Sequence, residues 1–131
     1  MAATRIKLDL DSTDTLDFER EVSIPTPDGR ELKIPFTYIY RDRVAMAELF
    51  DEFAQQAKDD ADRGDAVNAE VARAVVESDV QTIMQIANGW GIEGVKFTAE
   101  NIRKLCVRYA GAATAILLDY RVSLTQGRLG N

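Results

Sequence analysis

The sequence predicts an α+β fold, in which an N-terminal β-hairpin or small antiparallel meander is followed by three or four packed α-helices. Three observations predict it. Apolar residues alternate in steps of two up to about residue 41, and they recur in steps of three and four after that. The length of 131 residues, 46% of them hydrophobic, suffices for one domain with its own core. We expect a single domain over 1–131, with a variable N-terminal segment (1–17), a hairpin (18–41) and a helical part (42–126).

The hairpin is predicted by two segments whose apolar residues each fall on one face: Phe18, Val22 and Ile24, then Leu32, Ile34, Phe36, Tyr38 and Tyr40. Between them, Thr26-Pro27-Asp28-Gly29 has proline and glycine at the positions that a type I turn favours. Pro35 lacks an N–H, so we expect its strand to lie at a sheet edge or bulge there. Ahead of the hairpin, Ile6, Leu8 and Leu10 alternate with charged residues and predict a half-buried strand.

Helical spacing begins after Asp42, a plausible N-cap, with apolar residues at Met46, Leu49, Phe50, Phe53 and Ala57. The polar stretch around Gly64 should end this helix. A second helix is predicted from about Ala66 to Asn88, ending at Gly89. Its apolar residues cover more than one narrow stripe, so this helix is either central or carries a second contact surface.

The last part of the chain predicts two more helices. Residues 90–97 form a glycine-punctuated connector, and Thr98 is placed to cap a helix that carries Ile102, Leu105, Cys106 and Tyr109. The chain should bend or break around Gly111. A final amphipathic helix then carries Ala113, Ile116, Leu117, Tyr120 and Leu124.

The composition excludes several kinds of catalytic site. The chain has no histidine and one cysteine, which removes Ser-His and Cys-His nucleophile pairs, histidine-bound zinc and disulfide or CxxC sites. No apolar run approaches the roughly 20 residues that span a bilayer, and no signal peptide follows Met1. We therefore expect a non-enzymatic, cytoplasmic domain that needs no cofactor.

The net charge of −6 disfavours a nucleic-acid or anionic-membrane binder. The charge is also unevenly distributed: residues 51–80 carry nine acids and three bases (net −6), whereas residues 81–131 carry three acids and six bases (net +3). This asymmetry is typical of solvated helix faces. Complementary patches that orient copies of the chain or a partner are the alternative.

Two local patterns suggest chemistry but lack its context. Residues 89–94 match G-x-G-x-x-G, yet a predicted helix precedes them where the dinucleotide motif requires a strand, so we expect a connector rather than a cofactor site. Cys106 lies on an apolar helix face, which predicts core packing rather than a reactive thiol.

Acidic clusters provide a first alternative function, a metal-assisted hydrolase. An EF-hand loop counted from Asp9 has Asp14 where glycine is required and Arg20 where the bidentate glutamate should be, so a calcium site is not expected. A second cluster, at Asp59, Asp60, Asp62 and Asp65, reads as a solvated helix end. A thermal-shift scan with divalent cations separates this alternative, because specific metal binding stabilises the folded state.

A basic cluster provides a second alternative, a small nucleic-acid-associated regulator. Arg103, Lys104 and Arg108 lie on one predicted helix without aromatic residues on the same face, which is more typical of a solvated helix. Absence of binding at low salt would exclude this function.

The chain resembles the small tail assembly chaperones of long-tailed phages and prophages over about residues 18–131. The segments that carry the resemblance are Phe36-Thr37-Tyr38, Arg41-Asp42-Arg43, Gly89-Trp90-Gly91-Ile92, Phe97-Thr98-Ala99-Glu100-Asn101-Ile102, Tyr109-Ala110-Gly111-Ala112-Ala113-Thr114-Ala115-Ile116, Asp119-Tyr120-Arg121, Leu124-Thr125 and Gly127-Arg128-Leu129-Gly130-Asn131. These are packing residues rather than a catalytic signature.

The resemblance implies a protein that holds the helical tape measure protein extended and delivers tail tube subunits around it. It also implies several copies acting together in the bacterial cytoplasm, and absence from the mature virion. A chaperone for an amphipathic helix needs apolar grooves rather than a reactive centre. We therefore take Met84, Trp90, Tyr109 and Tyr120 as candidate partner-binding residues, with core packing as the competing role of each.

Overall fold

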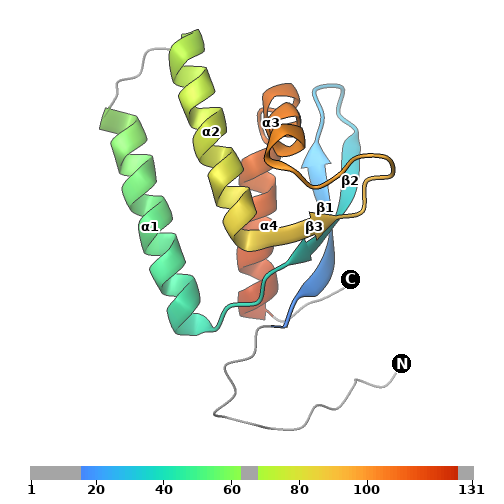
Figure 1. Cartoon of the computed structure of the whole chain (residues 1–131), viewed down its shortest axis with the longest axis vertical. Helices are drawn as coiled ribbons and strands as arrows, with labels where there is room; N and C mark the ends of the chain where they lie inside the picture. Colours follow the sequence, from blue (N-terminus) through green and yellow to red (C-terminus); the bar gives the residue numbers. More distant parts are fainter. Residues whose placement is uncertain (1–15, 63–67, 127–131) are drawn as a thin grey trace, which may run out of the picture.

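The computed structural model describes residues 16–62 and 68–126, which form a sheet with helices against one face (Figure 1). In chain order the described elements are β1 (Phe18–Pro25), β2 (Glu31–Tyr38), α1 (Arg43–Asp62), α2 (Ala69–Ile86), β3 (Ala87–Trp90), α3 (Ala99–Arg108) and α4 (Ala112–Gln126). The strands are antiparallel in the order β1-β2-β3. The predicted α+β class is confirmed. The strand predicted at Ile6, Leu8 and Leu10 lies outside the described residues.

The predicted hairpin is confirmed, including its turn. Val22 pairs with Ile34 and Ile24 with Leu32 in the register of β1 and β2. The Gly29 amide donates to the Thr26 carbonyl at 3.1 Å, and Gly29 has a φ of 82°. A type I turn followed by a left-handed residue is a common three-residue hairpin loop, and glycine adopts that φ without a steric penalty.

Pro35 lies in the central strand, so the alternative of an edge strand is wrong, and the register irregularity of β2 against β3 falls between Thr37 and Tyr38 rather than at Pro35. The Pro35 carbonyl accepts a hydrogen bond from the Gly91 amide at 2.7 Å, on the side of β3. In an antiparallel strand the N and C=O of one residue face the same side. The nitrogen of Pro35 therefore points toward β3, and its missing N–H costs no hydrogen bond to β1. On the β3 side, the paired residues end at Phe36 and Trp90, next to Pro35.

The second helix ends earlier than predicted, because the chain forms β3 there. Helix α2 stops at Ile86, and Ala87–Trp90, predicted as helix end and connector, pairs with β2. Ala87 is already extended (φ −134°, ψ 152°), and the Ile39 amide donates to the Ile86 carbonyl at 2.9 Å. Pairing with the open side of β2 thus overrides local helix propensity, which is a weak preference.

The predicted caps of the first and third helices are confirmed. The Asp42 carboxylate accepts from the Ala45 amide at 2.8 Å at the start of α1, and the Thr98 hydroxyl accepts from the Asn101 amide at 3.2 Å at the start of α3. Helix α2 begins at Ala69 rather than about Ala66, since the Asn68 side chain caps it by accepting from the Val71 amide. Side-chain acceptors at these positions satisfy amides that have no partner within the helix.

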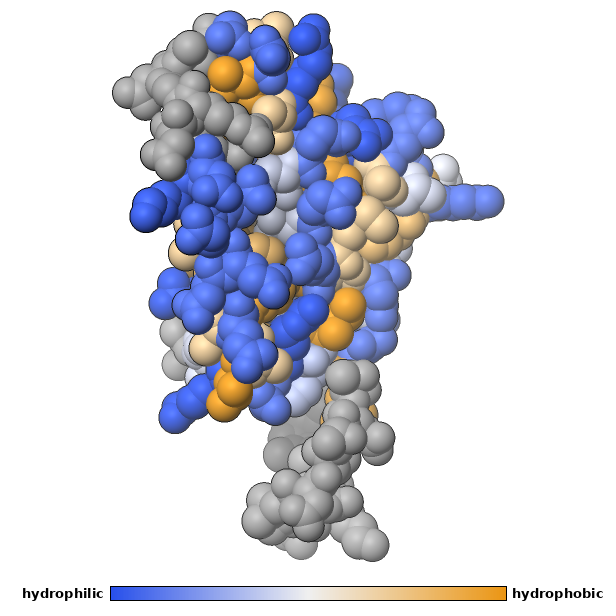
Figure 2. Space-filling model, turned by 60° about the vertical axis from the view of Figure 1, so that its left-hand side comes forward, coloured by the Kyte–Doolittle hydropathy of each residue, from blue (hydrophilic) through white to orange (hydrophobic). Residues whose placement is uncertain are grey.

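The core lies between the sheet and helices α2, α3 and α4. Helix α4 packs against β1, and α2 packs against α3 and α4. Helix α1 lies farthest from the strands (Figure 1) and buries Leu49, with Phe50 and Phe53 packed against the core edge. Figure 2 turns this side forward: its surface is mostly hydrophilic, with hydrophobic residues in separate patches.

A series of aromatic contacts crosses the sheet. Phe18 and Phe36 flank the Tyr38 ring with centroid distances of 5.6 and 5.8 Å, and Phe36 meets Trp90 edge-on at 5.9 Å. Tyr38 also meets Tyr120 of α4 at 5.1 Å. Aromatic pairs of this geometry contribute about 0.5–1.5 kcal/mol each beyond the area that they bury.

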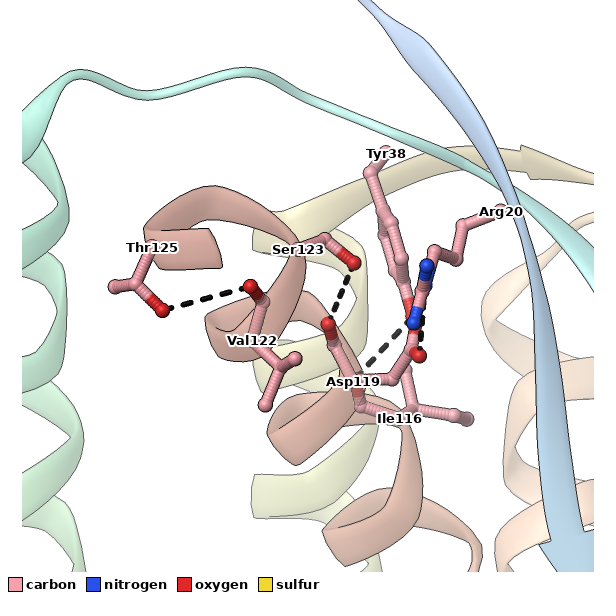
Figure 3. Close-up of polar contacts among 7 residues, drawn as sticks. All are labelled: Arg20, Tyr38, Ile116, Asp119, Val122, Ser123 and Thr125. Carbon is pink, nitrogen blue, oxygen red and sulfur yellow. Dashed lines mark hydrogen bonds and ion pairs between the residues drawn. The ribbon is translucent and has the colours of Figure 1, made fainter. Parts of the chain in front are cut away.

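A polar cluster joins α4 to the two N-terminal strands (Figure 3). The Asp119 carboxylate accepts from Arg20 Nε at 2.9 Å and from the Tyr38 hydroxyl at 3.0 Å, and the Tyr38 hydroxyl lies 3.3 Å from the Ile116 carbonyl. Ser123 donates to the Asp119 carbonyl at 2.7 Å. Because these groups are largely buried, their partners spare them the cost of desolvation. The cluster therefore fixes the position of α4 on the sheet.

Candidate functional site

An apolar groove of about 650 Å³ lies between α2 and α3. We call it the α2–α3 groove. It is lined by Ala69, Ala72, Arg73, Val75, Val76, Glu77, Asp79, Arg103, Cys106, Val107 and Ala110. Grooves of this volume with mostly apolar walls and a few charged groups are typical of binding sites.

The groove lining includes small residues from both of its sides. Ala72 on α2 and Ala110 after α3 leave space that larger side chains would fill. Val75 and Val107 are 39% and 67% exposed although both belong to the groove wall. Exposed valines in a groove with apolar walls give a partner apolar surface to cover.

Charged residues bridge the two helices at the groove wall. Arg103 Nε lies 3.0 and 2.9 Å from the two carboxylate oxygens of Glu77, and Arg103 Nη2 lies 2.7 Å from Glu77 Oε1. These hydrogen bonds lower the pKa of Glu77 and raise that of Arg103. The geometry is a fork-like pairing of guanidinium and carboxylate, which adds a specific contact between α2 and α3.

Cys106 lies buried against the same groove, as predicted from its apolar helix face. Burial, and secondarily the nearby Asp79 charge, raises the pKa of its thiol to about 12. The thiolate is the nucleophilic form of cysteine. The thiol is therefore protonated at neutral pH.

The four candidate partner-binding residues lie on different parts of the fold, and none lines the α2–α3 groove. Met84 is exposed on α2, and Tyr120 is fully buried, donating to the Ile39 carbonyl at 2.7 Å. The Trp90 ring packs edge-on against Phe97 at 5.2 Å.

Besides Tyr120, two more of the four have polar partners. The Trp90 indole N–H donates to the Val95 carbonyl at 2.8 Å, and the Tyr109 hydroxyl accepts from Arg108 Nε at 3.2 Å. The partner-binding role of all four stays a prediction.

The basic cluster on α3 is paired rather than free. Arg103 bonds Glu77, Lys104 lies 3.8 Å from Glu100, and the Arg108 guanidinium lies over the Tyr109 ring at 5.6 Å. These contacts compete with phosphate binding and lower the support for the nucleic-acid alternative.

The acidic clusters are described only in part. Asp9, Asp11 and Asp14 lie outside the described residues, as does Asp65, and nothing is described of the side chains of Asp60 and Asp62. Asp17 accepts a hydrogen bond from the Asn88 amide, and Asp59 accepts one from Gln55 at 3.1 Å. Within residues 16–62 and 68–126, no three His, Cys, Asp or Glu side chains are grouped closely enough to hold a metal ion.

Sequence reasoning missed the groove residues Ala72, Val75, Val107 and Ala110. One signal pointed to the groove residues of α2: the apolar residues of this helix cover more than one stripe, and Val75 belongs to the part that the core leaves exposed. Val107 had no such signal, since it stands among basic residues.

Within the described residues, no helix has the length and apolarity needed to cross a membrane.

Comparison with known proteins identifies the chain's family. No characterised protein and no solved structure matches the chain. The profile of a family described as phage tail assembly chaperone matches residues 1–131, the whole chain. The chain therefore belongs to the phage tail assembly chaperone family.

Proposed function

We propose that this chaperone binds an amphipathic helical segment of the tape measure protein in the α2–α3 groove and recruits tail tube subunits during tail assembly. The observation that carries the proposal is the exposure of Val75 and Val107 in an apolar groove of a tail assembly chaperone. An amphipathic helix commonly binds by laying its apolar face into such a groove.

The groove offers both parts of a helix-binding site. Its apolar residues suit the apolar stripe of a helix, with side chains at spacings of three and four. Arg73, Glu77, Asp79 and Arg103 at its wall supply charges of both signs for the polar flanks of that helix. Such charges contribute more to orientation than to affinity.

The remaining parts of the proposal concern the setting. We propose that several copies of the chain act together in the host cytoplasm, without catalysis, and leave before the virion is complete. The opposite net charges of residues 51–80 and 81–131 support repeated contacts between copies or with the partner.

The test uses a matched pair of valine substitutions. Val107 in the groove and Val44 on α1 are 67% and 65% exposed, so Val107→Asp and Val44→Asp introduce the same charge at similarly exposed positions. We expect Val107→Asp to weaken binding of a labelled amphipathic tape measure peptide at least about 10-fold, since burying a valine contributes roughly 1.5–3 kcal/mol. Val44→Asp should change the affinity less than about 2-fold.

Fluorescence anisotropy with the purified full chain measures both affinities, and circular dichroism checks that both variants fold. Equal affinities for the two variants would show that the peptide binds elsewhere. Absence of any binding by the wild-type chain would contradict the proposal as a whole.

A further inference from the structure

Strand β1 has an outer edge that no other strand of the described residues covers. The Pro35 carbonyl bonds Gly91 on the β3 side, and Glu21 lies opposite Pro35 in the hairpin register. Residues opposite each other alternate between bonded and non-bonded pairs in an antiparallel ladder. The backbone groups of Glu21, and by alternation those of Glu19 and Ser23, therefore face away from β2.

An apolar groove accompanies this edge, between β1 and α4. It has a volume of about 320 Å³ and is lined by Val22, Ser23, Ala115, Leu118, Asp119 and Val122. Its α4 residues have the spacing of one helix face, and Leu118 is 59% exposed. The groove thus presents apolar surface beside β1 that no strand of the described part of the chain covers.

The sequence contains a segment of matching chemistry just ahead of β1. In residues 5–10, Ile6, Leu8 and Leu10 alternate with Arg5, Lys7 and Asp9. This segment lies outside the described residues, and residues 11–17 connect it to β1. A strand with this pattern places apolar side chains on one face and charged side chains on the other.

We propose that residues 5–10 add to the outer edge of β1 of the same chain as a fourth, antiparallel strand. The apolar residues of the segment then cover Leu118 and Val122, on the face of the sheet that Val22 shares. Antiparallel registers of that parity place Arg5, Lys7 or Asp9 opposite Glu21, which is exposed on the outer face, and the two basic residues attract its charge. Opposite charges at such cross-strand positions are favourable.

The uncovered edge itself supports the assignment. Among the described residues, no strand pairs with the outward N–H and C=O groups of this eight-residue strand. Such groups are a template for pairing with any extended chain, and natural proteins cover or charge such edges. Antiparallel pairing of β1 with a second copy about Glu21 would place the two Glu21 side chains opposite each other, which is unfavourable. Residues 5–10 of the same chain have bases at positions 5 and 7, whose charge is complementary to that of Glu21.

The test is amide hydrogen exchange of the full chain, followed by NMR. The amides of Glu19, Glu21 and Ser23 face the proposed strand, whereas the amides of Val22 and Ile24 face β2 and serve as internal references. We expect the three outward amides to be protected in the wild type. In Leu8→Asp their exchange should accelerate at least about 10-fold, because a local opening exposes them, while the references stay protected.

Asp9→Asn is the matched control, because residue 9 lies on the outer face of the segment and its negative charge does not attract Glu21, and it should accelerate exchange of these amides less than about 3-fold. Unprotected outward amides in the wild type would overturn the proposal, and so would equal effects of the two variants. Protection that increases with protein concentration would overturn it in favour of a strand from a second copy. If the Val22 amide also loses protection in Leu8→Asp, that variant has opened more than the outer edge of β1. Leu8→Ser is therefore measured as well, and the same outcomes apply to it.

Discussion

The thiol of Cys106 is a potential nucleophile that the fold keeps buried. Its side chain lies on α3 against the α2–α3 groove, and it is buried among apolar neighbours. Burial raises the pKa from an ordinary value of 9.0 to about 12. The residue thus belongs to the packing of the groove rather than to a site of chemistry.

We expect Cys106 to react with iodoacetamide at pH 8 more slowly in the folded chain than in urea, by up to roughly a thousandfold, since a pKa raised from 9.0 to about 12 lowers the thiolate fraction by about that factor. Mass spectrometry of timed samples measures both rates. Similar rates in the two states would show that the thiol is accessible and ionised in the folded chain.

The same shift in pKa has a consequence for stability. The folded chain retains a proton that the unfolded chain loses above about pH 9, so the contribution of this group is complete below pH 9 and is lost as the pH rises toward 12. Cys106→Ser removes this component of the pH dependence and is the control for it.

The sequence predicted the role of single residues correctly where that role depends on contacts with neighbouring residues in the chain. Asp42, Thr98 and Gly29 act through backbone groups within three residues of themselves, so their caps and turn were predictable. The bonds from Arg20 and Tyr38 to Asp119 join residues 99 and 81 positions apart. Nothing local in the sequence specifies such a pairing.

Among the elements, α4 is joined to the sheet by one polar cluster as well as by its buried core residues. Tyr38 is fully buried, and its hydroxyl donates to Asp119 and lies beside the Ile116 carbonyl. Burial, followed by the Asp119 charge, raises the pKa of Tyr38. The hydroxyl therefore stays protonated and acts as a donor from β2 to α4.

We expect Tyr38→Phe to lower the free energy of unfolding by about 2 kcal/mol, because a hydrogen bond to a charged group contributes roughly 1.5–3 kcal/mol. Urea denaturation followed by circular dichroism gives the value. Tyr40→Phe is the matched control: Tyr40 is exposed, and its substitution should cost less than about 0.5 kcal/mol. Equal costs would mean that the bond to Asp119 does not stabilise α4.

The order of the elements was predictable, but one of them was not. The hairpin and the helices follow from periodicities of two and of three to four, which each segment carries in its own sequence. Strand β3 is four residues long and follows α2 directly, so its pattern is too short to detect. It forms because β2 offers an open side, which is a tertiary effect.

For the whole molecule, the packing is uneven. Helices α2, α3 and α4 share the core with the sheet, whereas α1 is attached mainly through Leu49, Phe50 and Phe53. The Arg121 guanidinium of α4 lies 5.9 Å from the centre of the Phe50 ring. Residues 54–59 of α1 are exposed.

We expect the amides of residues 54–59 to exchange roughly 100-fold faster than those of residues 80–86 in α2, because segments with few buried contacts open locally at low free energy. Hydrogen exchange with mass spectrometry measures the difference. Phe53→Ala should widen it, by removing the last core contact of α1. Equal protection of the two segments would show that α1 opens only with the whole domain.

The groove illustrates the limit of sequence reasoning at the same scale. Periodicity tells which helix face is apolar, but not whether another element covers it. Val75 and Val80 belong to the same apolar set of α2, yet Val80 is buried and Val75 is exposed. The difference arises from where α3 lies, which sequence patterns do not specify.

Helix α2 passes into β3 without an intervening residue, so the helix and the strand are joined directly. We expect a ligand that shifts α2 to shift β3 with it. The chain's single tryptophan, Trp90, stands at the far end of β3. Its emission spectrum is thus placed to register an event at a groove that it does not touch.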